Sequence, residues 1–147
     1  MLDGGSRPDH RRPDRRTLIY RQSGLLGVSG LSSKMRVLRA SAEPAAREVL
    51  ALFVYRIVRE IGSMIAALGG IDGLVFVDGI GENDPATRAE VVEGCRWTDM
   101  LLDQYRNANG TGQISADKSR VNVQVIPTDK ERLIACYTRE VPRIPAE

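Results

Sequence analysis

A glycine-rich turn at residues 79–83, with the sequence GIGEN, is the segment of this chain best suited to chemistry. It follows an apolar run at 74–77, which predicts a buried strand, and precedes a helix that Asn83 or Asp84 can cap and Pro85 can open. Glycines let a backbone approach a ligand closely, and the N–H groups at a helix start favour anions. Because ligands bind at the carboxyl ends of strands in α/β sheets, we expect a nucleotide or phosphate contact here. The alternative is an ordinary strand-to-helix turn, since the lysine of a Walker loop and the third glycine of a Rossmann fingerprint are absent.

Two further segments carry side chains suited to phosphate or metal chemistry. The run SGLSSKMR ends at Arg36, whose guanidinium could hold a phosphate or stack on a base, although serines and arginines are also usual in solvated turns. The run VIPTDKERL follows a second strand pattern, where a carboxylate could hold a magnesium ion through water. The alternative for this run is a helix start whose acidic residues face the helix dipole, and spacing alone favours it.

The histidine and the cysteines exclude several kinds of catalysis. His10 is the only histidine and lies in a segment nearly without apolar residues, so a histidine general base inside the fold is excluded. Cys95 and Cys136 are far apart and match no metal-ligand spacing. Two lone cysteines and no secretion signal indicate reduced thiols and a cytoplasmic protein. We expect Cys95 and Trp97 to be packing residues.

The hydrophobic pattern predicts the elements that position these segments. Gly24, Gly27 and Gly30 predict turns, and a short helix follows Ser33. Apolar residues then recur at threes and fours from 45 to 68, which predicts a long helix. Five elements follow it: a strand at 74–77, a helix to about residue 97, a short helix around 99–107, a strand at 121–125 and a final helix to about residue 138. This order predicts an α/β layer with parallel strands.

Composition limits the possible partners. Residues 1–17 predict a disordered basic leader, because Gly, Pro, Asp and Arg dominate and cannot bury enough surface to order the chain. Its interleaved aspartates and missing aromatics argue against a nucleic-acid arm. The formal net charge of +2 argues against a polyanion binder, and no apolar run is long enough to predict a membrane span. Residues 18–147 are the predicted folded region.

Several segments together resemble the C-terminal region of acetate kinases and the closely similar propionate kinases. The matching stretches are YRQSGLLGVSGLSS at 20–33, LFVYRIVREIGSMIAALGGIDGLVF at 52–76, GIGEN at 79–83 and RVNVQVIPT at 120–128. A last segment, LIACYTRE at 133–140, is similar in character, and the order and spacing agree. The resemblance covers nearly everything from about residue 18 onward.

The resemblance implies an α/β fold: the C-terminal part, incomplete, of an ATPase-fold domain like those of actin, hexokinase and Hsp70. It implies reversible transfer of the γ-phosphoryl group of ATP to acetate, with Mg²⁺, in a homodimer. The implied ATP-binding residues fall in two groups: Lys34, Met35 and Arg36, and the loop residues Gly79, Ile80, Gly81, Glu82 and Asn83.

Three positions depart from the family pattern. Lys34 stands where the family has an aspartate, and Asp78 where it has glycine or another small residue. Lys130 aligns with the glutamate linked to magnesium, and a protonated lysine cannot ligate a metal. Glu131 is therefore the candidate metal-linked residue, with Asp129 as another possibility.

The family's catalytic residues have no counterpart in this sequence. The implied N-terminal domain and the first part of the second domain are absent, so the resemblance predicts a fragment that is inactive alone unless a separate N-terminal fragment complements it. The alternative is a non-catalytic nucleotide-binding or dimerising remnant, which the lysines at 34 and 130 favour. Surface left by the absent parts predicts marginal stability and self-association.

Overall fold

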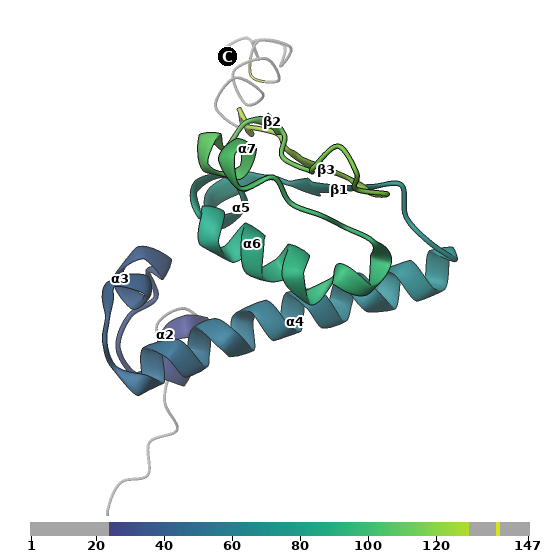
Figure 1. Cartoon of the computed structure of the whole chain (residues 1–147). Coiled ribbons are helices and arrows are strands. Elements are labelled where there is room, and N and C mark those ends of the chain that lie inside the picture. Colours follow the sequence, from purple (N-terminus) through teal and green to yellow (C-terminus); the bar gives the residue numbers. More distant parts are fainter. Residues whose placement is uncertain (1–23, 130–137, 139–147) are drawn as a thin grey trace, which may run out of the picture. The chain divides into compact units, whose positions relative to one another are not determined.

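The computed structural model of the chain describes residues 24–129 and residue 138 (Figure 1). The chain divides into two compact units, Met1–Phe53 and Val54–Glu147, and each is described by itself. The predicted leader and most of the predicted final helix lie outside the described residues.

Two short helices precede the long helix in the first unit. The glycine-rich stretch predicted as turns instead forms α2 (Gly24–Ser29), which ends at Gly30 with a φ of 65°. The short helix predicted after Ser33 is α3 (Met35–Ala40). Buried apolar side chains hold this unit together, because they remove apolar area from water: Met35, Leu38, Ala46, Val49 and Leu50.

The long helix predicted from periodicity is α4 (Pro44–Leu68). Pro44 is its first residue, where the missing N–H costs nothing because the first turn has no intrahelical acceptor for it. The helix stops at Gly69 and Gly70, whose φ values of 75° and 142° suit glycine alone, and the Gly70 N–H closes the end on the Ile65 carbonyl at 3.1 Å. Within the described residues no helix has both the length and the apolar character needed to cross a bilayer.

A three-stranded sheet organises the second unit. The two predicted strands form a parallel pair, β1 (Gly73–Phe76) and β3 (Asn122–Val125), with Leu74 opposite Val123. A third strand that the sequence did not indicate, β2 (Gly112–Gln113), pairs antiparallel with β3 and gives the order β1-β3-β2. The parallel α/β arrangement is therefore confirmed, with one antiparallel edge added.

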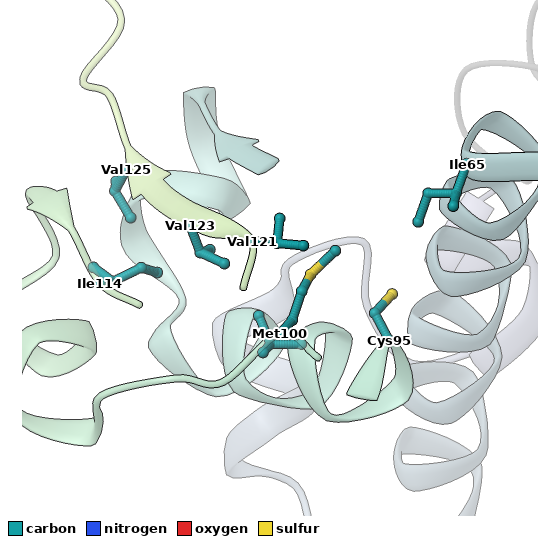
Figure 2. Packing of buried hydrophobic residues seen from close by; sticks show 8 residues of the cluster. Ile65, Cys95, Met100, Ile114, Val121, Val123 and Val125 are labelled. Atoms are coloured by element: carbon teal, nitrogen blue, oxygen red, sulfur yellow. The ribbon is translucent and has the colours of Figure 1, made fainter. Parts of the chain in front are cut away.

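The core of the second unit lies between this sheet and the helices that precede and follow β1. Figure 2 shows the buried side chains that make it up and labels all of them but Val92: Ile65, Val92, Cys95, Met100, Ile114, Val121, Val123 and Val125. Cys95 is a packing residue, as predicted, and burial raises the pKa of its thiol. Trp97 is not, since 62% of its surface is exposed.

The helices after β1 are shorter than predicted. A six-residue helix, α5 (Asp78–Asn83), comes first, and then α6 (Pro85–Gly94), a 3-10 turn η1 (Arg96–Thr98) and α7 (Gln104–Asn109). Gly94 ends α6 where a Cβ atom would lie 2.6 Å from the Val58 Cγ2 atom of α4, so any larger residue would force Val58 to shift.

Candidate functional site

The GIGEN segment is a helical turn and not the loop that its glycines predict. It forms α5, entered from the extended residue Val77 and interrupted at Gly79, whose φ of 17° and ψ of −94° are not helical. Asp84 then caps α6, because its Oδ1 atom accepts hydrogen bonds from the N–H groups of Ala86 and Thr87, each at 3.1 Å. Of the two predicted caps, Asp84 is the one used.

Asp78 takes the left-handed conformation that connects β1 to α5. Its φ is 58°, which costs an L-residue other than glycine strain energy, and aspartate tolerates it better than most because its side chain bonds locally. Here the Asp78 Oδ1 atom accepts the N–H of Gly79 at 2.9 Å. The geometry explains why glycine suits this position and how aspartate can replace it.

Glu82 ties α5 to the end of β3. Its Oε1 atom accepts the N–H groups of Thr128 and Asp78, both at 2.7 Å, and the Asp78 N–H also reaches the Thr128 Oγ1 atom at 3.1 Å. These bonds, chiefly those from Thr128, lower the pKa of Glu82, while burial and the Asp78 carboxylate act in the opposite direction. Two segments almost fifty residues apart in sequence are thereby fixed to one another.

Arg88 braces the same turn from inside the protein. Its side chain is fully buried on α6, and its Nη1 atom donates to the carbonyls of Gly81 and Glu82, both at 2.8 Å. Its Nε and Nη2 atoms donate to the side-chain and main-chain oxygens of Asn107 at 2.8 and 2.6 Å. Burial lowers the pKa of Arg88 and the nearby Asp84 carboxylate partly offsets this. The planar guanidinium thus restrains the path of the glycine-rich backbone through its hydrogen bonds.

Sequence reasoning did not single out Arg88 or Asn107. A signal was present, because Arg88 lies three and four residues before Val91 and Val92, on the buried face of α6. A charged residue on an apolar helix face needs buried partners. The spacing therefore indicates that Arg88 has a structural role inside the fold.

The surface of the turn is acidic and its first amides are already used. Asp78, Glu82 and Asp84 place three carboxylates within seven residues, and the N–H groups of Asp78 and Gly79 already donate to carboxylates. A bare phosphate at those amides would displace these bonds and meet like charge. Gly79 is exposed, and a Cβ atom there would meet nothing within 4 Å, so a ligand can approach the backbone on this side. The turn therefore suits an uncharged nucleoside portion better than a bare phosphate.

The predicted ATP-binding residues 34–36 lie in the first unit, and their side chains differ in exposure. Lys34 and Arg36 are exposed, while Met35 is buried, with only 8% of its surface exposed. The Ser32 Oγ atom accepts the Lys34 N–H at 3.0 Å, which fixes the entry to α3. The two cations are therefore available to an anionic ligand, and Met35 is placed for packing.

The predicted metal site is only partly within the described residues. Thr128 and Asp129 are exposed after β3, whereas Lys130 and Glu131 lie outside the described residues. Among the residues that the structure describes, no three His, Cys, Asp or Glu side chains come together to hold a metal ion. The Glu82 Oε1 atom is already bonded to protein N–H groups. The described residues thus do not fit a magnesium-binding set.

A pocket of about 510 Å³ lies at the other end of the sheet. It is lined by residues that precede the parallel strands, including Asp72 and Val121, and by Trp97 and Arg120. Ligands of α/β sheets bind at the carboxyl ends of strands, where α5 lies. By this rule the α5 end of the sheet, and not the end with this pocket, is where a ligand is expected.

A parallel α/β sheet with a braced glycine-rich turn at the carboxyl end of a strand is typical of the α/β proteins that bind ligands at this end of the sheet. The Acetokinase family model matches residues 12–136, and the chain belongs to this family. An acetate kinase of Rhodopseudomonas palustris is 53% identical over 120 residues, which are 80% of this chain and 30% of that protein.

Comparison with solved structures supports the same family. The acetate kinase of Porphyromonas gingivalis matches with a TM-score of 0.74 and 37% identity, over 84% of this chain and 33% of that one. A propionate kinase of Francisella tularensis matches with a TM-score of 0.76 and 29% identity, over 86% and 33% of the two chains. The fold is part of the acetate kinase fold, and the chain spans about a third of the length of these relatives.

Proposed function

We propose that this chain supplies one wall of a nucleotide site of the acetate kinase type. The observation that supports this most is that the family match spans both predicted nucleotide segments, 34–36 and 79–83. In the proposal, the exposed side of Gly79 contacts the nucleoside part of ADP or ATP. Arg36 holds a phosphate oxygen through its guanidinium.

The proposed reaction is that of the family, phosphoryl transfer between ATP and acetate, completed by residues outside this chain. Transfer of this kind depends on positioning and on neutralising charge at the γ-phosphoryl group. This chain's contribution is to hold the turn: Arg88 and Glu82 keep its backbone fixed, so that the nucleotide meets a surface already formed. Because the described residues do not fit a magnesium set, no step is assigned to a metal here.

The second candidate is a nucleotide-binding remnant without catalysis. The exposed Lys34, where the family has aspartate, and the acidic surface of α5 favour it, since both alter a nucleotide site without removing it. This candidate predicts binding of ADP and no product under any condition.

Binding is tested with ADP and the full chain. ADP at millimolar concentration is expected to raise the melting temperature, because a ligand that binds only the folded state stabilises it. Arg36→Ala should weaken binding by about tenfold, or about 1.4 kcal/mol, through the lost phosphate contact. Lys118→Ala, which removes an exposed cation from another loop, is the matched control and should bind as the wild type does. An unchanged melting temperature at millimolar ADP would contradict both candidates.

Catalysis is tested by co-expression with the part of the R. palustris acetate kinase that this chain does not match. Acetyl phosphate formed from ATP, magnesium and acetate, trapped with hydroxylamine, would support the enzymatic candidate. ADP binding without product, in a complex that has assembled, would leave the remnant as the function.

A further inference from the structure

The pocket at the amino ends of the parallel strands is not used by the proposed nucleotide site. All of its lining residues belong to the second unit, and its volume of about 510 Å³ lies within the range of about 300–1,000 Å³ usual for small-molecule sites. Ile65 and Val121 line it and are also part of the buried core, so it has an apolar base. Its polar groups then decide which ligand it suits.

The C-terminal end of α4 contributes negative partial charge to this pocket. Leu68, Gly69 and Gly70, where α4 stops, are among the lining residues. Carbonyl groups point toward the C-terminus of a helix, and those of its last turn have no intrahelical N–H partner. Together with the helix dipole they favour a positively charged ligand and disfavour an anion.

The charged side chains of the pocket also favour a cation. Asp72 and Arg120 line it, and among the residues that the structure describes Asp72 forms no ion pair. The Arg120 side chain is 80% exposed and its Nη1 atom lies 4.0 Å from the Asp99 Oδ2 atom, so water and Asp99 both screen its charge. Two carboxylates and one guanidinium leave a net negative charge here.

Trp97 adds an aromatic surface that the rest of the fold does not bury. It lines the pocket with 62% of its surface exposed. Its ring lies beside α4 at Gly62, where a Cβ atom would be 3.7 Å from the Trp97 Cζ2 atom. The N–H and Oγ1 groups of Thr98 both donate to the Cys95 carbonyl, at 2.9 and 2.6 Å, which holds the turn that carries the indole. The face of a tryptophan ring attracts cations more strongly than that of any other side chain.

We propose that this pocket binds a small organic cation that carries an alkylated ammonium group. The alkyl groups pack on Trp97 and on the apolar base, while the positive charge meets Asp72 and the carbonyl end of α4. A nucleotide does not suit the pocket, because its phosphates would meet net negative charge. A phosphocholine headgroup is disfavoured for the same reason, so the ligand is a free cation. The proposal does not depend on nucleotide binding at α5.

Choline and its neutral isostere 3,3-dimethylbutan-1-ol test the role of charge, because they differ only in a nitrogen that replaces a carbon. Trp97 is the only tryptophan of the full chain, so its emission reports on this pocket. Choline should change the emission saturably and bind at least about tenfold more tightly than the alcohol. Sodium chloride at equal ionic strength is the control and should give no saturable change. Equal binding of the two compounds, or no binding of choline, overturns the proposal.

Two charge variants should act in opposite directions. Asp72→Asn should weaken choline binding by about fivefold, and Arg120→Gln should strengthen it by about twofold. Asp117→Asn removes a carboxylate that pairs with Arg106 and does not line the pocket, so it is the matched control and should bind as the wild type does. The reverse order of the two affinities would assign the pocket to anions and overturn the proposal.

Trp97→Leu separates the aromatic contribution from simple apolar contact. Leucine keeps an apolar side chain and removes the ring, so calorimetry should show choline binding weakened by at least about fivefold. Binding of the neutral alcohol should stay within about twofold of the wild type. An equal loss for both compounds overturns the proposal. If Trp97→Leu does not fold, the Asp72 and Arg120 variants decide.

Two further measurements fix the source of the cation and exclude contacts between copies. Phosphocholine should bind at least about fivefold more weakly than choline, and equal or tighter binding would overturn the assignment to a free cation. The titrations are run at a protein concentration at which the chain sediments as a monomer. A response to choline that appears only where the chain associates would assign the surface to a second copy and overturn the proposal. Choline binding without ADP binding would retain this proposal and contradict the nucleotide function.

Discussion

At the scale of single residues, the candidate site depends on a buried arginine more than on its glycines. Glycine lets the backbone take the φ of 17° at residue 79, but it does not select that path. Arg88 restrains the residues that follow, because its planar guanidinium donates to the carbonyls of Gly81 and Glu82 while it also bonds to Asn107. The order of the turn therefore comes from α6 and α7.

Arg88→Lys should destabilise the fold and loosen the turn. Lysine cannot make the four bonds at once, so carbonyls of Gly81, Glu82 and Asn107 lose their donors inside the protein. We expect a loss of about 2–4 kcal/mol in the free energy of unfolding by urea. Arg96→Lys, at an exposed arginine paired with Glu93, is the matched control and should change it by less than about 0.5 kcal/mol. Similar values for both variants would contradict the bracing role.

At the scale of elements, Glu82 joins α5 to the end of β3, and this link should depend on pH. The folded pKa of Glu82 is lowered from its ordinary value of 4.5, so the unfolded state binds more protons than the folded state in acid. The stabilisation is then fully present above the unfolded pKa and is lost as the pH falls through the folded pKa. Because Glu82 titrates only in acid, its protonation does not alter the stability of the fold near neutral pH.

The melting temperature measured as a function of pH checks this link. Below about pH 5 the wild type should lose stability more steeply than Glu82→Gln, which has no titrating group at this position. Glu93→Gln, at an exposed carboxylate on α6, is the control and should keep the wild-type slope. Parallel curves for the wild type and Glu82→Gln would show that this carboxylate does not join the two segments.

The elements that sequence could predict are those with long, regular patterns. α4 and the β1–β3 pair follow from apolar periodicity and from a continuous apolar run, and both are confirmed. β2 was missed because two residues of a Gly-rich stretch carry no pattern. The helical turn at 78–83 was predicted as a loop because glycine disfavours helix locally, and the bonds that override this preference come from Arg88 and Thr128. The Arg88 contacts leave a trace only in the spacing of Arg88 to Val91 and Val92 on the buried face of α6, and not in the composition of the turn itself.

At the scale of the whole molecule, several large apolar side chains of the second unit remain on the surface. Met64 and Leu68 on α4 are 63% and 73% exposed, and Trp97 is 62% exposed. Leu68 and Trp97 also line the pocket at the amino ends of the strands. Exposed apolar groups that gather in one place favour association.

We expect the purified chain to self-associate through this surface. Trp97 is the only tryptophan, so its fluorescence reports on this region alone, and its emission should shift to shorter wavelength as protein concentration rises. Leu68→Lys should weaken association by about tenfold in sedimentation equilibrium. Tyr105→Lys, at a tyrosine 79% exposed on α7, is the control and should have a smaller effect. A monomer with constant emission at all concentrations would contradict this prediction.

The unequal edges of the sheet also limit how far assembly by strand addition can go. A fibre grows when every subunit offers two compatible edges, one to bind the previous subunit and one to receive the next. Among the described residues, β2 has two residues and is a poor edge for pairing, so strand addition to this sheet is favoured at β1 alone. Pairing at this sheet therefore favours a closed complex over a growing fibre.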